Sequence, residues 1–237
     1  MGVKRIALQL ALWLACTCTC GWAASVHAAP STPLQLSCEN ASDEAEKKRI
    51  AASAADVVRR ISATRLVIKA GGKTLALVDK GDPQRFDGEG DFYRYCERKD
   101  GFILIRHVDG HLDSGKLINE ATGDIVPGGA RVLFSQDRRA YLAIFEKDGS
   151  EGSHWRVYAA DGRLSWDGYD YLHPPGNLGW VLAYMVQPSW DERGRLSAEA
   201  RCESDPKRAW KVTLVKVGAT WDWRPAPKCP KFASEKE

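Results

Sequence analysis

The sequence has neither a strong charge excess nor a recognisable catalytic motif. Its 237 residues include 34 Lys and Arg against 31 Asp and Glu, a net charge of +3, so bulk electrostatics give no case for nucleic acid or an anionic membrane as partner. It contains no G-x-S-x-G nucleophile motif and no glycine loop that opens a helix to bind phosphate. Hydrophobic residues at 44% and charged residues at 27% exclude a disordered chain, a collagen and a polytopic membrane protein. We therefore predict no catalytic residue, no resident metal and no cofactor.

The first 28 residues have the three-part pattern of a secretory signal. Lys4 and Arg5 form a basic region, residues 6–15 are apolar apart from one Gln, and small side chains precede a cleavage site after Ala28. An uncleaved anchor helix and a lipoprotein are the alternatives. The segment carries two basic and no acidic residues, so cleavage lowers the net charge to +1. We expect residues 29–237 in the periplasm or outside the cell, with no integral membrane span after cleavage.

Four cysteines remain after the predicted cleavage, and none of them has C-x-x-C spacing. An even number of cysteines in an exported chain predicts disulfides, and the spacing argues against a zinc or thioredoxin-like site. Four cysteines allow three pairings. We favour Cys38–Cys96 and Cys202–Cys229, which would staple the two ends of the domain separately.

One amphipathic helix is predicted near the start of the exported chain, over residues 43–60. Ser42 is a good N-cap residue, and acidic residues precede basic ones, which suits the helix dipole. The apolar residues at helical spacing are Ile50, Ala54, Val57 and Ile61. We expect the charged face to be solvated; a partner-binding helix is the alternative.

The rest of the chain has the pattern of short antiparallel strands separated by turn residues. Two β-prone runs flank Gly71-Gly72 and predict a tight hairpin. The further strands are expected at residues 92–97, 102–108, 116–119, 131–135, 141–145, 155–159, 164–166, 180–186, 196–202, 210–217 and 220–223. The fold class is therefore mainly β, a single domain over residues 29–237. Residues 29–97 form a helix-plus-hairpin module and residues 102–226 contain antiparallel β-meander repeats.

The meander region contains an internal repeat, with one copy at residues 134–168 and another at 188–223. Each copy has a Trp-to-Trp step of eleven residues, and a more degraded copy covers residues 102–125. The matching positions are Asp137 and Asp191, Trp155 and Trp210, and Trp166 and Trp221. Repeated positions usually carry packing, so we expect Trp166 in the core.

Two turn sequences within these repeats resemble those of WD-type β-propeller blades. Residues 134–143 (FSQDRRAYLA) look like the FSPDG-x-x-LA turn, and residues 119–123 (NEATG) look like the D-x-x-TG hairpin. The resemblance covers roughly residues 102–223 and carries weakly specific motifs. It implies propeller-blade-like sheets, three around an axis or two packed face to face as in a β-sandwich, and no particular activity.

The candidate binding surface is the aromatic-rich stretch of residues 166–180, which we expect to be a loop because it holds two prolines and several glycines. Large aromatic side chains with polar tips give much contact area at low entropic cost. The candidate binding residues are Tyr169, Tyr171, His173 and Trp180. The alternative for Trp180 is a core position at the end of a sheet.

The best candidates for metal ligands are His107, Asp109, His111 and Asp113. They occupy every second position, so on one continuous strand their side chains would share a face. Imidazole and carboxylate groups together suit a zinc or similar ion. However, Asp109-Gly110 is a turn signal that separates these residues.

These features lead to the expectation of a non-catalytic, exported envelope protein of a Gram-negative cell that binds a macromolecular partner, either a protein or the cell wall. An inhibitor or immunity-type protein is its most concrete form. The alternatives are a metal-dependent hydrolase using His107, Asp109 and His111, and a peptidoglycan- or carbohydrate-binding module.

Overall fold

The computed structural model describes residues 33–38, 42–81, 90–109, 112–146, 152–173, 181–226 and 229. The protein is mainly β: 61% of the described residues are strand, and they form 17 strands of antiparallel sheets with a single short helix. This confirms the predicted antiparallel meander. In the described part of the chain, no helix is long and apolar enough to cross a membrane.

The helix α1 (Asp43–Ser53) begins as expected and ends earlier than expected. The Ser42 hydroxyl caps it by accepting a hydrogen bond from the Ala45 N–H. The prediction that the helix continues to residue 60 is wrong, because β2 (Val58–Ser62) pairs with the next strand instead. Strand pairing buries Val58 and leaves Ile61 59% exposed. Of the apolar residues at helical spacing, Ile50 therefore lies in α1 and Ile61 in β2.

The expectation of a fully solvated charged face on α1 is also wrong at one position. Glu46 is 1% exposed. Its carboxylate accepts two hydrogen bonds from the Arg60 guanidinium, at 2.6 and 3.0 Å, and one from the Tyr95 N–H at 2.6 Å. Arg60 also donates to the Tyr93 carbonyl. This buried pair therefore ties the helix to β2 and to the strand that carries Tyr93 and Tyr95.

The chain then forms four sheets. The first sheet is β2–β3–β4, with β3 (Arg65–Ala70) and β4 (Lys73–Val78) joined by the predicted hairpin at Gly71-Gly72. Both glycines have positive φ, as a tight hairpin turn requires. The second sheet, in order, contains β5 (Asp91–Lys99), β6 (Phe102–Asp109), β7 (Leu112–Asn119) and β8 (Ile125–Gly128).

The third and fourth sheets contain the two repeat copies. The third, in order, has β1 (Gln35–Ser37), β9 (Arg131–Phe134), β10 (Ala140–Glu146), β11 (Ser153–Ala159) and β12 (Leu164–Tyr169). The fourth has β13 (Tyr171–Leu172), β14 (Ala183–Trp190), β15 (Leu196–Cys202), β16 (Ala209–Val217) and β17 (Thr220–Arg224). The described strands between residues 102 and 223 lie in three of the four described sheets, as one of the two expected arrangements has it, and the first sheet precedes this stretch.

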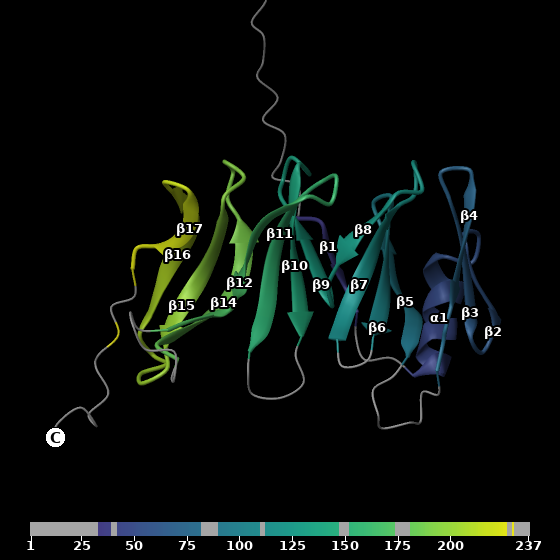
Figure 1. Ribbon diagram of the computed structural model, residues 1–237, viewed down its shortest axis with the longest axis horizontal. Coiled ribbons are helices and arrows are strands. Elements are labelled where there is room, and N and C mark those ends of the chain that lie inside the picture. The colour runs from purple at the N-terminus through teal and green to yellow at the C-terminus, as the bar shows by residue number, and fades with distance from the viewer. Residues whose placement is uncertain are drawn as a thin grey trace, which may run out of the picture. The chain divides into compact units, whose positions relative to one another are not determined.

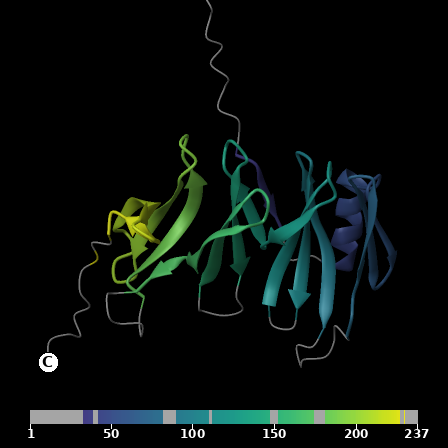
Figure 2. The ribbon, with the colours of Figure 1, turned by 45° about the horizontal axis from the view of Figure 1, so that its top comes forward.

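Three hydrophobic clusters join the sheets in chain order. The first cluster packs α1 and the first sheet on one face of the second sheet, around Ile68 and Ile103. The next cluster packs the other face of the second sheet on the third, around Leu104 and Tyr141. The last cluster joins the third and fourth sheets. Figures 1 and 2 show the sheets in this order. The inner sheets are thus covered on both faces, which explains their buried runs of Ile, Leu and Val.

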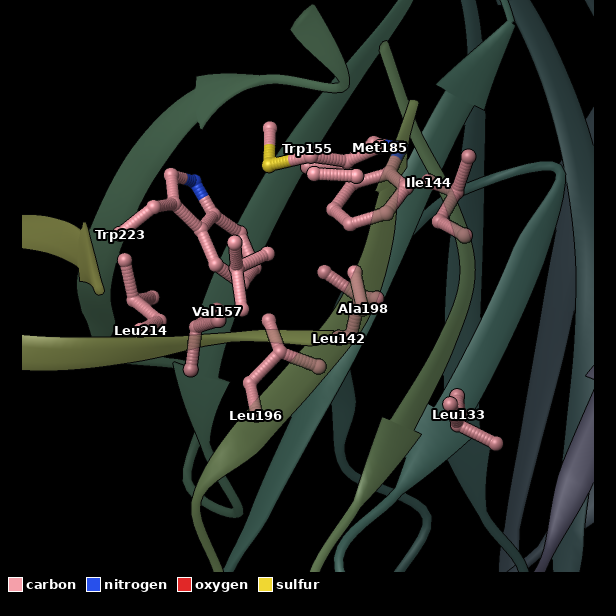
Figure 3. Packing of buried hydrophobic residues seen from close by; sticks show 12 residues of the cluster. Leu133, Leu142, Ile144, Trp155, Val157, Met185, Leu196, Ala198, Leu214 and Trp223 are labelled. Carbon is pink, nitrogen blue, oxygen red and sulfur yellow. The ribbon is translucent and has the colours of Figure 1, made fainter. Parts of the chain in front are cut away.

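The cluster between the third and fourth sheets is rich in large side chains from both repeats. Figure 3 shows Trp155 and Val157 of β11 close to Leu214 and Trp223 of the fourth sheet. Trp155 and Trp223 meet edge to face, with ring centroids 6.2 Å apart. The repeated strands thus pack on each other.

Both favoured disulfides are present. Cys38 and Cys96 lie 4.8 Å apart between Cα atoms, and Cys202 and Cys229 lie 5.4 Å apart. Cys38 directly follows β1 of the third sheet, whereas Cys96 lies on β5 of the second. The first disulfide therefore links two neighbouring sheets and does more than staple one end.

Candidate functional site

The predicted aromatic loop is largely strand where the structure describes it. Tyr169 ends β12, Tyr171 opens β13, and His173 follows β13 directly. The prediction of a loop over residues 166–172 is therefore wrong, because these residues pair with β11 and β14. Trp180 and the rest of residues 174–180 lie outside the described part of the chain.

The three described candidates belong to a continuous row of five rings, which we call the ring ladder: Phe145, His154, Tyr169, Tyr171 and His173. Its members come from β10, β11, β12 and β13 and from the residue after β13. Successive ring centroids lie 6.1, 4.9, 4.9 and 5.1 Å apart. The two central contacts are stacked, and the two outer ones are tilted and edge to face. The ladder therefore crosses from the third sheet to the fourth.

Cross-strand register builds the first half of the ladder. Phe145 pairs with His154, and His154 pairs with Tyr169. Directly opposite residues on antiparallel strands have their side chains on the same face, close enough for rings to touch. Sequence reasoning missed Phe145 and His154 because each is an ordinary strand residue until the hairpin register is known.

A charged group lies beside the ladder. Asp167 of β12 hydrogen-bonds His154 Nε2 and accepts a 3.1 Å hydrogen bond from Arg156 Nε. The Arg156 guanidinium also lies over the Phe145 ring, 5.0 Å from its centroid, a cation–π arrangement. The rings and charges thus contact one another across three neighbouring strands.

A half-buried carboxylate and a glycine fix the crossing between the sheets. Asp170 connects β12 to β13, and its side chain accepts a 2.8 Å hydrogen bond from the Ser153 N–H. Burial raises the pKa of Asp170, although this hydrogen bond opposes the shift. Gly152 has φ +74°, and a Cβ there would lie 2.5 Å from Asp170 Oδ1 and 2.8 Å from Tyr171 Cδ1. The position therefore admits only glycine without a shift of the ladder.

The residues of the alternative metal site are not brought together among the described residues. The chain there contains no group of three or more potential ligands. His107 instead hydrogen-bonds Asp91 through Nε2 at 2.9 Å and stacks on Tyr93 at 4.6 Å. The hydrogen bond to His107 is the main cause that lowers the pKa of Asp91. His111 and the side chain of Asp113 lie outside the described residues.

Comparison with known proteins gives no match to a family model, a curated protein or a solved structure.

Proposed function

We propose that this chain is a non-catalytic, exported protein of a Gram-negative envelope that binds a protein partner through the ring ladder. The observation that carries the proposal is the ladder itself: five rings that cross from one sheet to the next, with Tyr169 38% exposed. Partly exposed, preorganised Tyr side chains are typical of protein-recognition surfaces. The two disulfides support a non-reducing compartment, the periplasm or the outside of the cell.

The geometry favours a protein over a sugar as the occupant of the ladder. A sugar ring that stacks on an aromatic side chain needs an open ring face. Tyr169 stacks on both His154 and Tyr171, so neighbouring rings already contact its faces. The ladder therefore offers ring edges, which suit the side chains of a protein.

An inhibitor or immunity-type protein is the most concrete form of this proposal. Such a protein acts by covering a site on its target, so it needs a rigid contact surface and no catalytic group of its own. The fixed ladder and its charged neighbours Arg156 and Asp167 supply this kind of surface.

Site-specific crosslinking tests the proposal. A photoreactive phenylalanine analogue replaces Tyr171 in the exported protein, and a matched variant carries it at Ile61, which is 59% exposed on the first sheet. We expect one discrete protein adduct from position 171 and none of that mass from position 61. The adduct should disappear when His154→Ala is added.

Equal adducts from both positions, or none from either, would contradict the proposal. If the protein sediments with insoluble peptidoglycan, and if this depends on Tyr169 and Tyr171, then the partner is the cell wall and not a protein.

A further inference from the structure

A second site lies between the third and fourth sheets, away from the ring ladder. We call it the indole pocket: a cavity of about 200 Å³ lined by Trp166, Trp190 and Trp221, with Arg195 and Ser165 among the other lining residues. The indoles come from β12, β14 and β17. Trp166 and Trp221 are the matching positions of the two repeats, so repetition brings both to one cavity.

Two of the indoles are held in place by the surrounding structure. Trp190 donates its indole N–H to the Leu133 carbonyl at 2.9 Å. Trp166 meets Trp223 edge to face at 5.8 Å. Trp166 also lies over Gly168, where a Cβ would come within 2.3 Å of its ring. The glycine therefore lets Trp166 lie along its own strand.

The third indole and a guanidinium complete the pocket. Trp221 is 40% exposed although it is one of the largest apolar side chains. Arg195 is held by Asp191, which accepts hydrogen bonds from the Arg195 backbone N–H at 2.9 Å and from its Nε at 2.8 Å. The same carboxylate accepts the Arg193 N–H. The turn thus fixes the Arg195 side chain, and Arg195 lines the cavity.

We propose that the indole pocket binds one pyranose ring of a glycan. A sugar ring has apolar faces and a polar edge, which match indole walls and a guanidinium donor. The volume is below the roughly 300 Å³ at which pockets for drug-sized ligands begin, so it holds one ring. A proline-rich peptide needs a longer aromatic groove, and a cationic ligand is disfavoured by Arg195.

This proposal is independent of the protein partner on the ring ladder, since the two sites share no side chain. It predicts weak binding of a free monosaccharide, with a dissociation constant on the order of 1 mM. Asp191 already pairs with Arg195 through Nε and Nη2, so a sugar carboxylate adds a second partner to the guanidinium and should bind only modestly more tightly than a neutral sugar.

The test is a titration of the protein, labelled with ¹⁵N-tryptophan, with N-acetylglucosamine and with glucuronic acid, followed through the indole N–H signals in NMR spectra. We expect both sugars to shift the signals of Trp166, Trp190 and Trp221. Trp221→Ala should weaken both sugars at least about tenfold, and Arg195→Gln should remove the preference for glucuronic acid.

Leu164→Ala is the matched control, since Leu164 is 49% exposed on β12 and does not line the cavity; it should bind both sugars as the unmodified protein does. Unchanged indole signals in both titrations would overturn the proposal, as would unchanged affinity in Trp221→Ala. Signals that move with a hexaproline peptide and not with either sugar would make the pocket a peptide site instead. The unshifted indole signals of each variant report that it is folded.

Discussion

Tyr169 and Tyr171 stack on each other with ring centroids 4.9 Å apart, although one ends a strand of the third sheet and the other opens a strand of the fourth. The pair is therefore both part of the candidate surface and a contact that spans two sheets. Its energy can be measured separately from any partner.

We expect the two tyrosines to be energetically coupled. Aromatic pairs contribute about 0.5–1.5 kcal/mol beyond the area they bury, so a double-mutant cycle of Tyr169→Ala and Tyr171→Ala should give a coupling in that range. Chemical denaturation of the four proteins measures it. Strictly additive losses would show that the stacking seen in the ladder contributes nothing to stability.

Gly152→Ala should destabilise the protein and disturb the ladder. Gly152 has φ +74°, and the added methyl would collide with Asp170 and Tyr171. Gly72→Ala is the matched control, because Gly72 has φ +71° and no atom within 4 Å of an added Cβ. The control should lose about 1–2 kcal/mol from its backbone conformation alone. Thermal unfolding should show a larger loss of stability for Gly152→Ala than for Gly72→Ala. Equal losses would show that the contacts of the added methyl with Asp170 and Tyr171 cost nothing.

Glu46→Ala should be among the most destabilising substitutions on α1. It removes the 2.6 Å carboxylate partner of the Arg60 guanidinium, which is 9% exposed, and leaves it the Asp79 carboxylate at 3.8 Å. Loss of one partner of a buried ion pair costs about 3–5 kcal/mol, and Asp79 should keep the loss near the lower end of that range. Lys48→Ala on the same helix breaks the Glu44–Lys48 pair, whose side chains are 75% and 77% exposed. Such a pair contributes under about 1 kcal/mol, so urea unfolding should separate the two variants clearly.

Asp191 should make stability depend on pH in the acid range. Burial raises the pKa of Asp191, but the hydrogen bonds from Arg195 and Arg193 outweigh it, so the pKa is lowered from its ordinary value of 3.8. The folded state then binds this proton more weakly than the unfolded state. The carboxylate therefore contributes stability above the ordinary pKa, and this contribution is lost as the pH falls through the lowered one.

Urea unfolding between about pH 6 and pH 3 of the protein and of Asp191→Asn tests this sign. The gap in unfolding free energy between them should narrow as the pH falls. Asp170→Asn is the control of opposite sign, since burial raises the pKa of Asp170. As the pH rises, the unfolding free energy of Asp170→Asn should increase relative to that of the unmodified protein. If the difference in unfolding free energy between the unmodified protein and Asp191→Asn stays constant across this pH range, the prediction is wrong.

The Cys38–Cys96 disulfide should contribute substantially to stability. It closes a loop with a sequence separation of 58 residues, for which the chain-entropy account gives about 4 kcal/mol. The double substitution Cys38→Ser with Cys96→Ser, which keeps the other disulfide, should lower the unfolding free energy by about 2–4 kcal/mol. An unchanged unfolding midpoint would show that the link between the second and third sheets is dispensable.

The sequence by itself determined the local features. Turn residues and alternating β-prone runs placed most strands, Gly71-Gly72 placed a hairpin, and Ser42 placed the start of the helix, because these signals act over a few neighbouring residues. The even cysteine count predicted two disulfides and left three pairings open, of which the structure has the favoured one. The repeat of Trp166 as Trp221 also indicated related sheets.

Only the tertiary structure decided which residues meet. Val58 left the predicted helix because pairing with β3 buries it fully. Glu46 became a buried ion-pair partner because β2 brings Arg60 to it. Phe145 and His154 joined Tyr169 and Tyr171 through strand register and through the crossing between sheets. These choices depend on contacts between residues far apart in the chain, and such contacts leave no periodicity in the sequence.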